Sequence, residues 1–177
     1  MRTGRLVLRN LAAADATQAY LGWMNDPLTT RFLEARLLEH DLGSLRTFIE
    51  CCNADPRVLL LGICLADDRH IGNIKLGPVD AFHGLASVGL LIGEQDCWGR
   101  GYATEAIEAV TAHAFRKLGL EKLTAGCYAS NVGSARAFLK AGWLEEGRSR
   151  AMWRLDDGRE DNIHLGVTRA DWSAGHP

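Results

Sequence analysis

The sequence lacks a long apolar segment. None of its 177 residues belongs to a hydrophobic run near the roughly 18 residues that cross a bilayer, so we expect no membrane partner. The stretch from Met1 to Leu6 has no apolar signal core, which predicts a cytoplasmic protein. Basic residues are not in excess either, because 20 Lys and Arg stand against 22 Asp and Glu and the net charge is -2. This balance argues against a nucleic acid partner.

The cysteines lack the count and spacing of a structural framework. They number five and fit no zinc pattern: Cys51, Cys52, Cys64, Cys97 and Cys127. We therefore expect reduced thiols packed as small apolar residues, and no bound metal. Repeats, low-complexity segments and linkers are also missing, which predicts a single domain over residues 1–177. Apolar residues make up 47% of the chain, enough for a sizeable core.

Short apolar runs and helical stripes follow one another along the chain. Asp15, with Gln18 three residues later, suggests the N-cap of a first helix, which Pro27 ends. Residues 156–158 read as a hairpin turn, and residues 172–177 as a frayed end. The predicted strands cover residues 5–9, 58–66, 70–79, 86–92, 122–127, 146–155 and 162–168, and further helices cover 42–52, 102–118 and 132–140.

The order of these elements predicts a mixed α+β fold. The sheet should be mostly antiparallel and flanked by about four helices. A strand, helix and strand in its middle predict one parallel pair, formed by the strands that end at Ile92 and Cys127. Helices leave both of these strand ends, which makes a crevice there a natural ligand site.

A glycine-rich turn follows the first strand of that pair. Gly99 and Gly101 permit backbone conformations that other residues resist, and the helix after them begins with Tyr102, Ala103 and Thr104. Free N–H groups at a helix start, with Arg100 beside them, predict a phosphate site. A plain tight turn is the alternative. A dinucleotide site is disfavoured because Thr104 replaces the third glycine, and a Walker loop because no Gly-Lys-Ser/Thr follows.

The segment from Cys97 to Ala106 resembles the acetyl-CoA motif of the GNAT acyltransferase superfamily, in its RimJ/RimL-type branch. Gly101 and Ala103 match the last fixed positions of the pattern Arg/Gln-x-x-Gly-x-Gly/Ala, whereas Trp98 replaces Arg or Gln. The likeness extends over nearly the whole chain. It includes Leu6-Val7-Leu8-Arg9, Ile71-Gly72-Asn73-Ile74, the segment from Asn131 to Trp143, and Gly158-Arg159-Glu160-Asp161.

This resemblance implies a GNAT-like fold in which acetyl-CoA opens the parallel pair, and transfer of its acetyl group to a primary amine by direct attack. It implies acceptor-side elements in residues 1–56, the acetyl-CoA region in 86–143 and a C-terminal hairpin in 144–170. The residues implied to bind the cofactor are Leu91, Ile92, Gly99, Arg100, Gly101, Tyr102, Ala103, Thr104, Asn131, Ser134 and Phe138. Capping of a helix is the alternative role for Asn131, and core packing for Phe138.

The catalytic groups of the family are only partly present. Many members protonate the leaving thiolate with a Tyr where this chain has Phe138, so Ser134 becomes the candidate donor and Tyr128 the runner-up. Ser87 stands where the family often has a carboxylate on the fourth strand. The general base is then a water chain or His83, which titrates in the right range. Asp161 and Glu94 are weaker candidates.

The acceptor is indicated by resemblance alone. The segments 20–27, 31–36 and 70–78 resemble N-acetyltransferases of bacterial surface-sugar pathways. Trp23, Arg31, Arg36 and Lys75 would then line the acceptor side, and the cations would bind an anionic nucleotide-linked amino sugar. Alternatives are a protein N-terminus, as in ribosomal-protein alanine acetylation, and a non-catalytic acetyl-CoA-binding module. A homodimer is frequent in the family.

Overall fold

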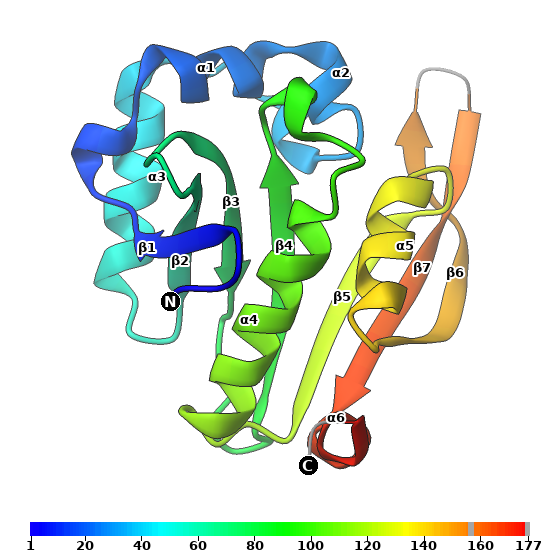
Figure 1. Cartoon of the computed structure of the whole chain (residues 1–177). Helices are drawn as coiled ribbons and strands as arrows, with labels where there is room; N and C mark the ends of the chain where they lie inside the picture. Colours follow the sequence, from blue (N-terminus) through cyan, green and yellow to red (C-terminus); the bar gives the residue numbers. More distant parts are fainter. Residues whose placement is uncertain (156–157, 176–177) are drawn as a thin grey trace.

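A computed structural model describes residues 1–155 and 158–175, which build one seven-stranded sheet with helices on both faces (Figure 1). Its spatial order is β1-β2-β3-β4-β5-β7-β6. All neighbouring strands are antiparallel except β4 and β5, which confirms the predicted mixed sheet with one parallel pair. The strands are β1 (Leu6–Asn10), β2 (Leu59–Leu65), β3 (His70–Leu76), β4 (Leu85–Ile92), β5 (Lys122–Tyr128), β6 (Leu144–Leu155) and β7 (Gly158–Thr168).

Helices form two layers over this sheet. They are α1 (Gln18–Asn25), α2 (Pro27–Thr30), α3 (Leu42–Ala54), α4 (Tyr102–Arg116), α5 (Val132–Lys140) and α6 (Arg169–Gly175), with short 3-10 helices η1 (Ala13–Asp15), η2 (Glu34–Leu37) and η3 (Gln95–Cys97). The larger core lies under α4 and α5, where the stripe that includes Ile107 and Val110 is fully buried. A smaller core under α1 and α3 contains Tyr20, Trp23 and Ile49.

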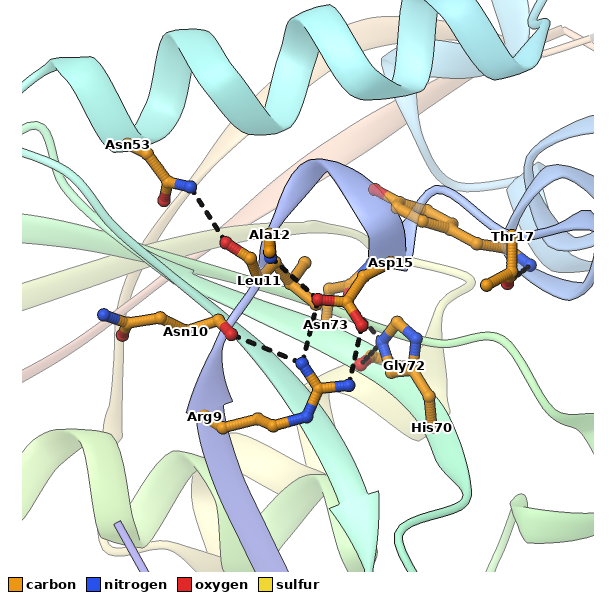
Figure 2. A network of polar contacts seen from close by, with 11 residues as sticks. Arg9, Asn10, Leu11, Ala12, Asp15, Thr17, Asn53, His70, Gly72 and Asn73 are labelled. Atoms are coloured by element: carbon orange, nitrogen blue, oxygen red, sulfur yellow. Dashed lines mark hydrogen bonds and ion pairs between the residues drawn. The ribbon is translucent and has the colours of Figure 1, made fainter.

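A polar network fastens the smaller helical layer to the sheet (Figure 2). The guanidinium of Arg9 on β1 pairs with both carboxylate oxygens of Asp15 at 2.8 and 2.7 Å. The ring of His70 on β3 lies 2.8 Å from the side-chain oxygen of Asn73. Asn53 of α3 donates to the carbonyl of Leu11 at 2.8 Å. These contacts tie η1 to β1 and α3 to the segment that follows β1.

Two sequence predictions about helix ends are wrong. Asp15 does not cap α1; Thr17 does, because the Asp15 carboxylate is taken by Arg9 and by the backbone N–H of Ala12. Residues 172–175 are not frayed but belong to α6, whose Trp172 packs on Phe115 with ring centroids 5.6 Å apart. The predicted turn at 156–158 and the last two residues lie largely outside the described residues.

β4 and β5 run side by side only at their beginnings. They pair at three positions, Leu85 with Lys122, Ala86 with Leu123 and Ser87 with Thr124, and then diverge (Figure 1). The C-terminal halves of both strands therefore border an opening in the middle of the sheet. The turn that starts α4 and the N-terminus of α5 follow these two strand ends.

Candidate functional site

The glycine turn leads directly into the start of α4. Gly101 is the N-cap and, like Gly99, has a left-handed backbone, with φ of 81° and 72°. Within the described chain, the N–H groups of Tyr102, Ala103 and Thr104 meet no acceptor; the first helical bond runs from Glu105 N to Gly101 O. Free N–H groups at the positive end of a helix dipole favour an anion such as phosphate.

An open cavity of about 930 Å³ lies against this turn. Part of its wall is the turn itself, at Gly99, Arg100 and Gly101, and part is one face of α4. It is lined by the cations Arg5, Arg100, Arg116 and Lys140, together with Thr3, Gly4, Thr104, Glu105, Glu108, Ala109, Ala112 and Trp172. Such a cationic groove fits a large anionic ligand.

Arg5 is a residue of this site that the sequence did not reveal. Its Nη1 donates to Arg100 O at 2.9 Å, its Nε pairs with Glu105 at 2.7 Å, and its guanidinium lies 4.7 Å from the Tyr102 ring centroid. Burial raises the pKa of Glu105, but hydrogen bonds from Thr3 and Arg5 outweigh it and hold that pKa below its usual range. Arg5, directly before β1, therefore fixes the turn from about a hundred residues away in the sequence.

The open edge of β4 offers unpaired backbone groups. Ser87 O accepts from Gly77 N, and Gly93 N donates to Ile71 O, both at 2.8 Å, so odd-numbered residues of β4 bond toward β3. Leu91, one of the residues implied to bind the cofactor, belongs to that set, so its N–H and C=O groups point to β3 and not to the opening. The backbone N–H and C=O groups of Leu90 and Ile92 point to the opening instead. The C=O of Ile92 already accepts a hydrogen bond from Trp98 Nε1 at 2.7 Å.

The start of α5 borders the same opening. The predicted alternative for Asn131 holds, because its side-chain oxygen caps α5 by accepting from Ser134 N at 3.2 Å. No hydrogen bond of the Ser134 hydroxyl is found among the described residues, and the side chain is half-buried. Phe138 is 2% exposed and packs on Trp143, which makes it a core residue rather than part of the wall of the opening.

Tyr128, the last residue of β5, is held by charged and aromatic neighbours. Arg36 Nη1 donates to its hydroxyl at 2.8 Å, and that hydroxyl donates to the Glu34 carboxylate. Its ring stacks on Trp153 with centroids 5.3 Å apart and an interplanar angle of 22°. Burial and the hydrogen bond to Glu34 raise the pKa of Tyr128. The hydroxyl consequently keeps its proton at neutral pH.

The remaining predicted residues are scattered. His83 lies in the turn before β4, at the end of the strand that is away from the opening. Its backbone N–H donates to the Asp80 carboxylate. Trp23 is buried and donates to Glu94 at 2.8 Å. Arg31 is exposed beside Phe32, and Lys75 is half-buried on β3 opposite Gly89 of β4.

Comparison with known proteins decides the family. A model of the acetyltransferase (GNAT) domain matches residues 5–144. The chain belongs to this GNAT family. It is 30% identical over 150 residues to the N-acetyltransferase YoaA of Bacillus subtilis, covering 83% of this chain and 84% of the relative. The chain is therefore an acetyl-CoA-dependent acyltransferase.

Solved GNAT structures share the fold. The spermidine N-acetyltransferase of Vibrio cholerae, solved with CoA and spermine, superposes with a TM-score of 0.85 at 17% identity, covering 97% of this chain and 99% of that one. A GNAT acetyltransferase from Bacillus anthracis gives 0.81 at 19% identity, with 95% and 97% covered. No helix in the described ranges is long and apolar enough to span a bilayer. Within the same residues, no cluster of His, Cys, Asp and Glu could hold a metal ion.

Proposed function

We propose that the glycine turn with the start of α4 (residues 99–104, the phosphate turn) and the open edge of β4 hold acetyl-CoA as acetyl donor. The observation that carries this is the divergence of β4 from β5 beside the unpaired N-terminus of α4. The pyrophosphate lies on Gly99 to Thr104, and the amide-bearing arm pairs with the backbone of Leu90 and Ile92. Asn131 and Ser134 border the arm from α5. Bound there, the donor supplies the acetyl thioester.

Ser134 protonates the departing thiolate. Its hydroxyl is uncommitted, whereas the Tyr128 hydroxyl already donates to Glu34. The remaining requirement is positioning, because attack by a neutral amine on a thioester needs no covalent enzyme intermediate. None of the cysteines is needed as a nucleophile.

The acceptor is a small amine that carries an anionic group, with a nucleotide-linked amino sugar as the favoured example. Lys75 lies on the sheet face opposite α4, next to Gly89, which has no side chain, and Arg31 is exposed in the turn after α2. Two carboxylates near this face are paired with cations, Glu34 with Arg36 and Glu94 with Arg69. A polycationic acceptor such as spermidine would have to compete with these arginines for the two carboxylates, so we disfavour it.

A panel of acceptors tests this proposal. Release of CoA thiol is followed with acetyl-CoA and, separately, glucosamine 6-phosphate, a UDP-linked 4-amino sugar, spermidine and a peptide that begins with alanine. The anionic amino sugars should react fastest, and Lys75→Met should raise their KM about tenfold. The matched variant Lys117→Met, at the C-terminal end of α4, should leave that KM unchanged. Faster reaction of spermidine or of the peptide refutes the acceptor class, and no acetylation of any amine refutes the catalytic proposal.

A further inference from the structure

The acceptor amine must lose a proton, and β4 provides no group to take it. A primary amine is largely protonated at neutral pH, and only the neutral form attacks a thioester. Ser87, at the position of the family's usual carboxylate, donates its hydroxyl to Gly77 O at 2.8 Å. His83 lies at the other end of the strand. The proton therefore needs another route to solvent.

Tyr128 lies at the edge of the opening, on the acceptor side. Leu123, Ala125 and Cys127 of β5 belong to the core under α4, so alternation directs Gly126 and Tyr128 to the opposite face. The contacts agree, because the ring of Tyr128 packs on Phe32, with centroids 5.7 Å apart, and on Trp153. On the same face, Gly126 is exposed and has no side chain, and the side chain of Asn162 lies beside it.

The Tyr128 hydroxyl is the central group of a chain of hydrogen bonds between Arg36 and Glu34. Its oxygen accepts one bond from Arg36, its proton is given to Glu34, and a hydroxyl oxygen has one further lone pair. Arg36 is itself fixed by the carbonyl of Leu33 at 2.9 Å and that of Arg154 at 2.8 Å. The Glu34 side chain is 54% exposed, so its carboxylate exchanges protons with water.

We propose that Tyr128 and Glu34 form a proton relay that deprotonates the acceptor amine. The ammonium N–H proton passes, directly or through one water, to the free lone pair of Tyr128 Oη. The original hydroxyl proton passes at the same time to Glu34, which releases it to solvent, and Tyr128 ends the cycle as a neutral phenol. Arg36 is a positioning residue that aims the hydroxyl. This inference rests on the proposed function.

Other charges around the relay do not replace it. Arg36 and Glu34 come from η2, and Arg31 from the turn before it. Glu160 on β7 accepts from the backbone N–H of Ser130 at 3.1 Å, and Asp161 from that of Ala151 at 2.9 Å. Glu34 is thus the carboxylate that the Tyr128 hydroxyl bonds.

Glu34→Gln is the decisive variant, since its amide oxygen still accepts from Tyr128 but takes no proton. With the fastest acceptor of the panel, kcat/KM is measured against pH. At pH 7 we expect Glu34→Gln and Tyr128→Phe each to lose about 10²-fold. Both should return to near the wild-type rate once the pH exceeds the pKa of the free amine. Glu160→Gln is the matched control and should follow the wild type throughout.

A second readout does not depend on turnover. Phenolate absorbance is titrated in the wild type and in Glu34→Gln, each referenced to a version carrying Tyr128→Phe. The pKa of Tyr128 should be lower in Glu34→Gln, because the carboxylate that holds the phenolic proton is gone. Wild-type kinetics of Glu34→Gln at pH 7, or a loss that is equal at every pH, overturns the relay while acetyl transfer stands. Failure to acetylate any amine overturns the proposed function, and the relay with it.

Discussion

Replacing Arg5 with methionine removes a guanidinium from the phosphate turn while keeping most of the aliphatic stem. The change deletes the 2.9 Å hydrogen bond to Arg100 O and the 2.7 Å ion pair with Glu105. A hydrogen bond from a charged donor contributes about 1.5–3 kcal/mol. The Arg5 side chain is 52% exposed, so solvent screening reduces the expected loss to about 1 kcal/mol.

This loss should appear in cofactor affinity, because Arg5 orients the turn rather than the reacting atoms. A change of about 1 kcal/mol corresponds to about fivefold in a dissociation constant. Calorimetric titration with CoA measures it directly, and the KM for acetyl-CoA should rise by a similar factor while kcat stays constant.

Arg9→Met is the control, since Arg9 lies four residues after Arg5, on β1, but pairs with Asp15, away from the turn. It should lower the melting temperature without changing CoA affinity. If Arg5→Met binds CoA as tightly as the wild type, the turn is ordered without Arg5 and the reasoning fails. Equal loss of affinity in both variants would point to global destabilisation instead.

Three other changes have defined outcomes. Gly101→Asp should abolish CoA binding in calorimetry, because it places a side chain at φ 81° and a negative charge in the anion site; retained affinity would make the turn merely structural. Ser134→Ala should lower kcat about 10²-fold with little change in the KM for acetyl-CoA, and an unchanged rate would move the proton donor to Tyr128 or water. The hydrogen bond from Arg9 outweighs burial and lowers the pKa of Asp15, so its contribution to stability is present at neutral pH and is lost as the pH falls below about 4. Asp15→Asn should therefore have a lower free energy of unfolding at pH 7. In denaturant titrations, this free energy should fall less steeply with decreasing pH than in the wild type, and an equal fall would mean that the ion pair does not contribute.

Local patterns in the sequence determined much of this molecule. The alternating strands, the buried stripe of α4 with Ile107 and Val110, and the left-handed glycines before Tyr102 depend on residues within a few positions of one another. The order strand, helix, strand around Gly101 also predicted the single parallel pair, because a helical crossover connects parallel strands. The phosphate turn and the neighbouring α5 start were therefore readable from sequence.

Tertiary structure alone decided the contacts between distant segments. Arg5 meets Glu105 across 100 positions, and Tyr128 meets Glu34 across 94. The alternation along a strand predicts which face of the sheet a side chain lies on. It does not predict which charged residue of another element contacts that side chain. Asp15 was misread for this reason, because its cap-like spacing is local while its partner Arg9 is supplied by the fold. Pairing of β4 with β5 at only three positions is likewise a property of the packed layers, and it leaves the sheet open between the C-terminal halves of the two strands.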